Sequence, residues 1–139
     1  MRAASSLFLN RELGLLEFNR RVLAQAEDKR TPLLERLRFL CIADSNLDEF
    51  FEIRVAGLKA QIAAGDEEPG PDGLTPEQVF RLISVEVHAL CERMYRLLND
   101  DIFPALAAEN IRFLRRSKWL DAQKAWVKAY FFRELMPLL

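Results

Sequence analysis

Ser45-Asn46-Leu47-Asp48-Glu49-Phe50-Phe51 sets an amide and two acids directly against a pair of aromatic residues, in the middle of a sequence that otherwise favours helix. Cys41-Ile42 precedes this stretch and Ile53 follows it, so the polar run is short and enclosed by apolar residues. Polar side chains buried there without partners would cost roughly 1–3 kcal/mol each. They must therefore cap a helix, satisfy one another, or face a ligand.

The residues on both sides of this stretch have the spacing of an amphipathic helix. Thr31 followed by Pro32 offers a start signal, with a capping residue and a proline at the first helical position. Ser45 with Asp48 three positions later resembles a capping box, so one long helix and two helices with a kink or restart near Ser45 are both open. The apolar positions of this helix are Leu33, Leu37, Leu40, Cys41, Phe50, Phe51, Val55, Leu58 and Ile62.

Helical patterns also lie on either side of this region. We predict a helix from Asn10 to Asp28, with Asn10 as its N-cap. Another helix begins at the capping box and proline of Thr75-Pro76-Glu77-Gln78. Its buried face is expected to comprise Val79, Leu82, Ile83, Val87, Leu90, Met94 and Leu97.

The remaining segments are shorter. A helix is expected from Ala105 to Glu109, irregular chain from Ile111 to Leu114, and a last helix capped by Ser117. Residues 66–73 contain two prolines, two glycines and four acids, which predicts an internal loop. No period-two pattern favours a strand. The sequence therefore predicts an all-α protein, an antiparallel bundle of roughly five helical segments in a single domain over residues 1–139.

The composition limits the possible partners. With 20 basic and 21 acidic residues the net charge is -1, so no overall field attracts nucleic acid or an anionic membrane. No apolar run approaches the roughly 20 residues of a membrane span, and Met1 to Leu9 holds too little apolar sequence for a secretory signal. Cys41 and Cys91 form no C-x-x-C pair and are expected to be buried free thiols. We expect a cytoplasmic protein.

Several kinds of site are absent from the sequence. The five glycines form neither a Walker nor a Rossmann phosphate loop. His88 lies in an ordinary amphipathic helix and is interpreted as structural. Residues 44–48 imitate the start of a calcium loop, but Glu49 and Val55 replace the required glycine and bidentate glutamate.

Basic residues form two further features. Arg115-Arg116-Ser117-Lys118 is compact enough to take a phosphate, although such a run more often marks a solvated helix entrance. Arg36 and Arg38 suit the polar face of a helix, with Glu35 close enough to balance them.

Three motifs occur in the first part of the chain. They are Leu9-Asn10-Arg11-Glu12-Leu13 with Leu16-Glu17-Phe18-Asn19-Arg20-Arg21-Val22-Leu23, then Pro32 to Leu40, then Ser45 to Lys59. Taken together, they resemble the amino-terminal domain of bacterial polyphosphate kinase in order and spacing. The resemblance is strongest from about Leu9 to Lys59 and continues more weakly to Leu139. The family often has Ser-Trp where this chain has Gly14-Leu15.

The resemblance implies an activity for the parent enzyme. Members of the family transfer the terminal phosphate of ATP reversibly to inorganic polyphosphate through a phosphohistidine, with Mg²⁺, and they are much longer than this chain. Their histidine-bearing domains lie toward the carboxyl end, and His88 matches none of the catalytic histidines. The resemblance thus implies a fragment without catalytic residues or metal ligands, inactive by itself. It would help to bind ATP and ADP and to build a homodimer.

The resemblance also assigns a substrate-binding role to Asn46, because the asparagine of the Asn-Leu-Asp-Glu-Phe motif contacts ATP in the family. A carboxamide can pair with the edge of adenine, and a helix start near Ser45 would add free N–H groups for an anion. The other interpretation is that Asn46 only caps or turns the helix. Asp48 and Glu49 are interpreted as helix-start acids, and Phe50 and Phe51 as core residues, one of which could border the purine.

Two functions of other classes compete with this interpretation. One is a helical protein-interaction (scaffold) module with no ligand of its own, since no complete site lies within the 139 residues. The other is an adaptor that regulates phosphate uptake, but such proteins are expected to show two similar halves and this chain has no internal repeat.

Overall fold

The computed structural model describes residues 8–139, and every regular element in that range is a helix. The all-α class expected from the sequence is confirmed. The chain divides into two compact units, Met1–Ala105 and Leu106–Leu139, each described here by itself, while the single domain over residues 1–139 stays a prediction. Met1 to Leu7, most of the stretch on which the absence of a secretory signal was inferred, lies outside the described residues.

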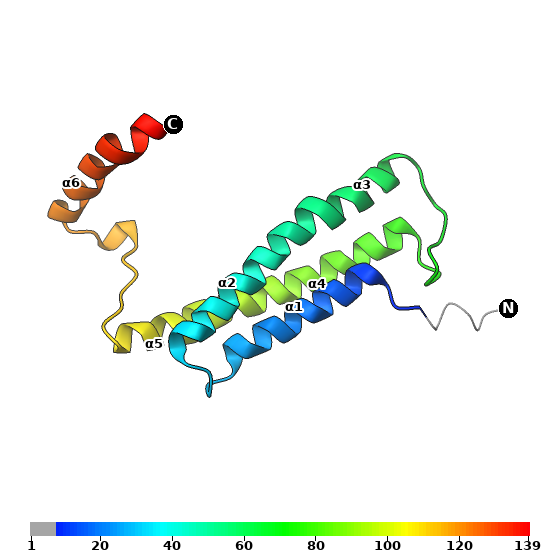
Figure 1. Cartoon of the computed structure of the whole chain (residues 1–139), viewed down its shortest axis with the longest axis horizontal. Coiled ribbons are helices and arrows are strands. Elements are labelled where there is room, and N and C mark those ends of the chain that lie inside the picture. Colours follow the sequence, from blue (N-terminus) through cyan, green and yellow to red (C-terminus); the bar gives the residue numbers. More distant parts are fainter. Residues whose placement is uncertain (1–7) are drawn as a thin grey trace. The chain divides into compact units, whose positions relative to one another are not determined.

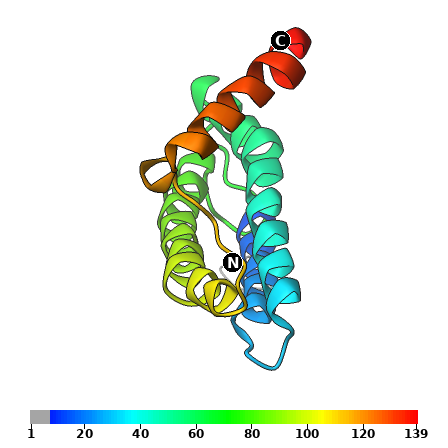
Figure 2. The ribbon, with the colours of Figure 1, turned by 90° about the vertical axis from the view of Figure 1, so that its left-hand side faces the viewer.

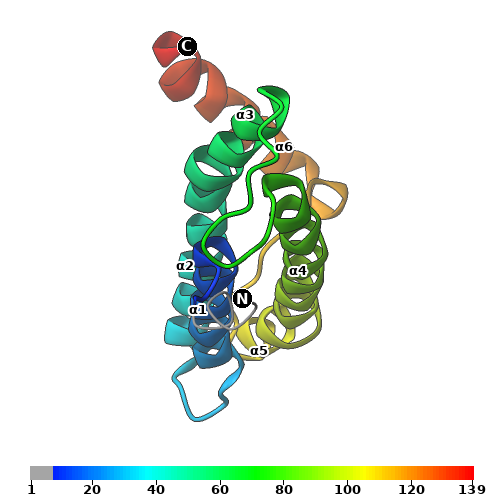
Figure 3. The ribbon, with the colours of Figure 1, turned by 90° about the vertical axis from the view of Figure 1, so that its right-hand side faces the viewer.

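The first unit is an antiparallel bundle (Figure 1). Helix α1 (Arg11–Glu27) leads through a short loop into α2 (Leu33–Glu49), the π-helical segment η2 (Phe50–Val55) and α3 (Ala56–Ala63), and these last three form one continuous helical rod. Helix α4 (Pro76–Arg96) then returns along the bundle. Helix α1 packs against both α2 and α4, and α3 packs against α4, as Figures 2 and 3 show from two sides.

Two elements continue from α4, namely the π-helical segment η3 (Leu97–Ile102) and α5 (Phe103–Ala108). In the second unit the chain is irregular from 111 to 115, as expected. It then forms the 3₁₀ turn η4 (Arg116–Lys118), helix α6 (Asp121–Tyr130), and the short segments η5 (Phe131–Leu135) and η6 (Met136–Leu138).

Local capping explains where two of the long helices begin. The Asn10 side chain accepts a hydrogen bond from the Leu13 N–H at 3.0 Å, which confirms it as the N-cap of α1. The capping box at the start of α4 is also confirmed, since Thr75 Oγ1 accepts from the Gln78 N–H at 3.3 Å and Gln78 Oε1 from the Thr75 N–H at 2.9 Å. Each of these bonds spans three residues, so the sequence shows both partners.

Two predicted caps are wrong. Helix α2 begins with Pro32 at the N-cap position and has no side-chain cap, so Thr31 does not cap it. Ser117 lies inside η4, and α6 begins only at Asp121, where the Gln123 side chain accepts from the Leu120 N–H at 2.8 Å. Pro32 is the N-cap residue of α2 and Leu120 that of α6, so neither hydroxyl residue occupies the N-cap position.

Apolar side chains from all the long helices fill the core of the first unit. Along α2 the buried positions follow at intervals of three or four, but Phe50 is followed by Val55, five positions on, across η2. Leu97 and Ile102 show the same interval across η3. Because a π-helical turn closes over five residues, these segments keep the apolar face turned inward. The core includes Leu16, Leu23, Leu40, Leu47, Phe50, Val55, Leu58, Val79, Ile83, Val87, Leu90, Met94, Leu97 and Ile102.

Several burial predictions are wrong. Leu82 and Phe51 are 43% and 44% exposed, because each projects from the side of its helix that faces away from the bundle. The two cysteines are free, but Cys41 is exposed and only Cys91 is half-buried. Burial, with a smaller effect from the Asp44 charge, raises the pKa of the Cys91 thiol.

Arg36 is the largest departure from expectation, since it is 5% exposed and does not lie on a polar surface. Its Nε donates to the Ala26 carbonyl at 2.7 Å and its Nη2 to Asp101 Oδ2 at 2.7 Å. The side chain thereby joins α2 to the end of α1 and to η3. The hydrogen bond from Arg36, followed by the charges of Arg36 and Lys29, lowers the pKa of Asp101 below its usual 3.8.

The predicted loop at 66–73 lies in the helix-free stretch between α3 and α4. Gly73 has a φ of 81°, a conformation that side chains disfavour, and its N–H donates to the Gly70 carbonyl at 2.8 Å. Asp72 accepts from the Asn10 side chain at 2.6 Å, which ties the loop to the start of α1.

Candidate functional site

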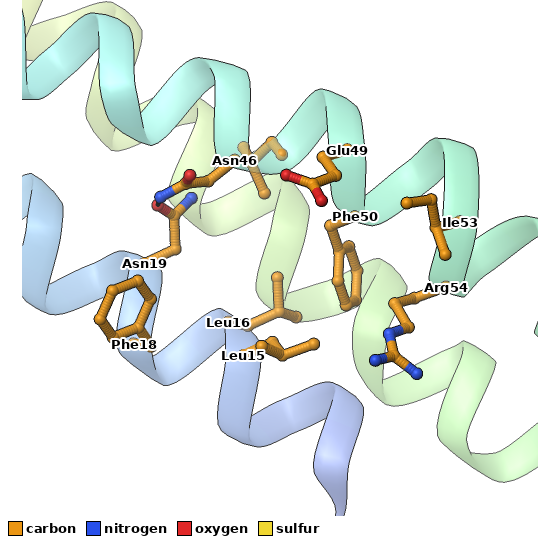
Figure 4. A pocket seen from close by; sticks show the side chains of 10 residues that line it. Leu15, Leu16, Phe18, Asn19, Asn46, Glu49, Phe50, Ile53 and Arg54 are labelled. Atoms are coloured by element: carbon orange, nitrogen blue, oxygen red, sulfur yellow. Dashed lines mark hydrogen bonds between the residues drawn. The ribbon is translucent and has the colours of Figure 1, made fainter.

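A shallow pocket of about 240 Å³ lies between α1 and the rod formed by α2 and η2 (Figure 4). Both helices contribute side chains, and Asn46, Glu49 and Arg54 bring polar groups to a mainly apolar surface. The full lining comprises Leu15, Leu16, Phe18, Asn19, Asn46, Leu47, Glu49, Phe50, Ile53 and Arg54.

The π-helical segment η2 supplies three of these residues. Its first N–H, that of Phe50, is shared between the carbonyls of Asn46 and Leu47, and the Ala56 N–H reaches back to Phe51 across a wider turn. Phe50 is 6% exposed and belongs to the core, while Ile53 and Arg54 follow on the same turn at the pocket. Single π-helical turns within α-helices are frequent at functional sites because they redirect side chains.

Asn46 is half-buried and bonded to a second asparagine. Its Nδ2 donates to Asn19 Oδ1 at 3.1 Å, and Asn19 Nδ2 donates in turn to the Ala43 carbonyl at 2.8 Å. Asn19 itself is only 3% exposed. Among the residues that the structure describes, no hydrogen bond to Asn46 Oδ1 is found.

The lining suits part of a planar ligand with a polar edge. Phe18, 51% exposed, and Leu15, 39% exposed, offer apolar surface, and the Asn46 amide offers a hydrogen-bonding edge. Arg54 adds a cation that can attract an anionic group. Since pockets that enclose a whole small molecule measure roughly 300–1,000 Å³, this one provides a wall and not a full enclosure.

Of the two possibilities left open near Ser45, the structure has the continuous helix and not a new helix start. Helix α2 is α-helical through Ser45 to Glu49, so the N–H groups there bond within the helix and form no anion site. Asp48 and Glu49 lie at the end of α2 and not in a first turn, so they are not helix-start acids. No helix begins at Asn46, so it does not cap one, and its contact with ATP stays a prediction.

Sequence reasoning missed Asn19 and Arg54 as lining residues. Asn19 lay within the first motif of the resemblance, which assigned it no role in a site, and its partner Asn46 is 27 positions away. The five-residue interval between Phe50 and Val55 is the one sequence signal that could have placed η2, and with it Arg54, at the pocket.

The other candidate groups lie elsewhere. His88 is exposed and its Nδ1 lies 2.6 Å from the Ser84 carbonyl. Over residues 8–139, no three His, Cys, Asp or Glu side chains are grouped so as to hold a metal ion. Within the same range no helix has the length and apolar character to span a bilayer.

The fold and the pocket define the class of protein, an all-helical domain with a shallow, partly polar pocket between neighbouring helices. Comparison with known families makes this specific: the family model for the polyphosphate kinase N-terminal domain matches residues 8–114. The chain belongs to this family, and the resemblance found in the sequence is confirmed.

Similar proteins agree with this assignment. The chain is 53% identical over 135 residues to a polyphosphate kinase of Pseudomonas syringae pv. tomato, covering 97% of this chain and 18% of that protein. It is 50% identical over 131 residues to the polyphosphate kinase of Burkholderia multivorans, covering 94% of this chain and 19% of that protein. The chain thus spans about a fifth of the length of these relatives.

A solved structure has the same fold. The crystal structure of polyphosphate kinase from Porphyromonas gingivalis matches with a TM-score of 0.74 and 31% sequence identity, covering 94% of this chain and 18% of that one. The arrangement of helices described above is therefore also found in an experimentally determined relative.

Proposed function

We propose that this chain provides one wall of the ATP site in a full-length polyphosphate kinase, with Asn46 as the residue that contacts the nucleotide. The full-length enzyme would transfer the terminal phosphate of ATP reversibly to polyphosphate, and the histidine-bearing part would lie outside these 139 residues. Mg²⁺ would be held there as well. The enzyme would act in the cytoplasm.

The observation that carries the proposal is the placement of Asn46 on a pocket with an amide oxygen that has no partner among the described residues. An amide oxygen without a partner loses about 1–3 kcal/mol when it is desolvated, unless a ligand supplies a donor. The exocyclic amine of adenine is such a donor. The small volume of the pocket agrees with a site that other parts of the enzyme complete.

Replacing Asn46 by Ala in the full-length enzyme is expected to raise the KM for ATP roughly 5- to 20-fold, since a hydrogen bond of about 1–2 kcal/mol is lost. The value of kcat should change much less, because the proposed contact of Asn46 is with adenine and not with the transferred phosphate. Steady-state kinetics with varied ATP and saturating polyphosphate measure both constants.

The matched control is Ser45→Ala, which changes the preceding residue of the same helix. Ser45 is exposed and does not line the pocket, so its KM should equal that of the unmodified enzyme. An unchanged KM in Asn46→Ala, with circular dichroism showing an intact fold, would refute the role in ATP binding. It would favour the scaffold module, which needs no ligand.

We propose also that this domain contributes to the homodimer of the full-length enzyme. Leu82 and Val85 on α4 support this, because they are 43% and 69% exposed and neighbour each other on the helix. Exposed apolar side chains that lie together favour protein contacts.

The double variant Leu82→Ser/Val85→Ser in the full-length enzyme is expected to weaken dimerisation about tenfold or more, because apolar area would no longer be buried. Analytical ultracentrifugation over a concentration series measures the dissociation constant. Arg38→Ser, at an exposed position on α2, should leave it unchanged. Equal constants for all three proteins would place the dimer contact elsewhere.

A further inference from the structure

We propose that Asn19 is a positioning residue that fixes the direction of the Asn46 amide, and that this fixed amide makes the site prefer adenine to guanine. The inference rests on the proposed function, because it gives the ATP-contacting residue a support and a specificity. Nothing in the motif itself assigns a role to Asn19.

A backbone carbonyl fixes the direction of the Asn19 amide. The Ala43 carbonyl can only accept a hydrogen bond, so the Asn19 atom 2.8 Å from it must be the amino nitrogen Nδ2. That places the Asn19 oxygen on the opposite side, facing Asn46. An oxygen again accepts only, so the Asn46 atom at 3.1 Å must be its own Nδ2. One carbonyl therefore determines the orientation of both side chains.

Burial makes this arrangement difficult to reverse. Asn19 is 3% exposed, so water cannot replace a lost partner. If the Asn46 amide turned over, its oxygen would meet the oxygen of Asn19, and a hydrogen bond would become a contact between two acceptors. Figure 4 shows the two amides next to each other at one end of the pocket, with Asn19 on α1 and Asn46 on α2.

The fixed orientation has a consequence for the ligand. With one amino proton bound to Asn19, the Asn46 oxygen is the acceptor that stays available on the pocket lining. Adenine carries an amine at position 6, which donates, whereas guanine carries an oxygen there, which accepts. At this oxygen the site would therefore attract the amine of adenine and repel the oxygen of guanine. An Asn46 free to turn over would accommodate either base.

The test is Asn19→Leu in the full-length enzyme, because leucine has nearly the same size and makes no hydrogen bond. The ratio of kcat/KM for ATP to that for GTP is measured for four proteins: unmodified, Asn19→Leu, Asn46→Ala, and the double variant. We expect Asn19→Leu to lower this ratio about 5- to 20-fold through the KM for ATP. A loss of stability alone would lower activity with both nucleotides equally and would leave the ratio unchanged.

The double variant separates a positioning role from an independent one. If Asn19 acts only through Asn46, the double variant should have the same ATP/GTP ratio as Asn46→Ala. Additive losses would overturn the inference, as would an unchanged ratio in Asn19→Leu. If Asn46→Ala leaves the KM for ATP unchanged, the proposed function itself fails. A raised KM in Asn46→Ala with a normal ratio in Asn19→Leu refutes only the inference.

A second variant keeps the test decisive if Asn19→Leu does not fold. In Asn19→Asp the buried carboxyl is expected to be protonated, so that its O–H donates to the Ala43 carbonyl and its other oxygen accepts from Asn46. Its ATP/GTP ratio should stay within about twofold of the unmodified enzyme, because the acceptor facing Asn46 remains. A fall of the ratio in Asn19→Asp to that of Asn46→Ala would overturn the role given to the Asn19 oxygen.

Discussion

Replacing Leu23 by Ala is expected to lower the free energy of unfolding of the 139-residue chain by about 3–5 kcal/mol, the range for a fully buried leucine whose removal leaves a cavity. Leu23 is 0% exposed and lies on α1, which packs against both α2 and α4. Three helices would therefore have to move to fill the space. Such a loss is a large part of the total stability of a small domain.

Urea denaturation followed by helical ellipticity measures this change. Tryptophan fluorescence is unsuitable, because Trp119 and Trp126 both belong to the second unit. The control is Leu34→Ala, since Leu34 is 59% exposed and its replacement should cost less than about 1 kcal/mol. Equal losses for the two variants would contradict the placement of Leu23 at the centre of the bundle.

Replacing Asp101 by Ala is expected to cost about 2–4 kcal/mol, because it leaves the buried Arg36 guanidinium without its opposite charge. The Arg36 side chain is 6% exposed and its Nη2 lies 2.7 Å from Asp101 Oδ2. Asp101 itself is 28% exposed, so the loss should not exceed that range. Asp100→Ala is the control, since its side chain is exposed one residue away. The same urea titration compares the two variants.

The stabilisation by Asp101 should also depend on pH. Its pKa is lowered in the folded protein, so the folded state favours the ionised carboxylate more than the unfolded state does. The contribution is complete above the usual value of 3.8 and is lost as the pH falls through the lower folded value. The difference between the unmodified chain and Asp101→Ala should therefore shrink from pH 7 toward pH 3. A difference that stays constant over this interval would argue against the ion pair.

The helices whose signals are local could be predicted from the sequence. Asn10 and Thr75 bond to residues three positions away, so the start of α1 and of α4 could be read directly. The helical spacing of the apolar residues likewise predicted most of the buried face of α4, with Leu82 as the exception. The candidate site was predicted only through Asn46 and the neighbouring Phe50, because both belong to one contiguous motif.

The rest of the site depends on contacts between distant residues, such as the hydrogen bond between Asn19 and Asn46.

Local signals also have a limit. A capping residue is a preference that a neighbouring turn can override, as the structure shows at Thr31 and Ser117. The sequence around Ser45 was compatible with a helix start. The structure instead has an unbroken α2 followed by η2, which keeps the apolar face inward beyond Phe50.

The sequence by itself determined the helical class, the order of the helices and the membership of the family, because periodicity, caps and contiguous motifs depend on neighbouring residues. Only the tertiary structure decided which polar side chains are buried and what they bind. Arg36 meets Asp101 65 positions away, and Asn19 meets Ala43 and Asn46 at 24 and 27 positions. Packing brings these partners together, and burial then requires each donor to find its acceptor.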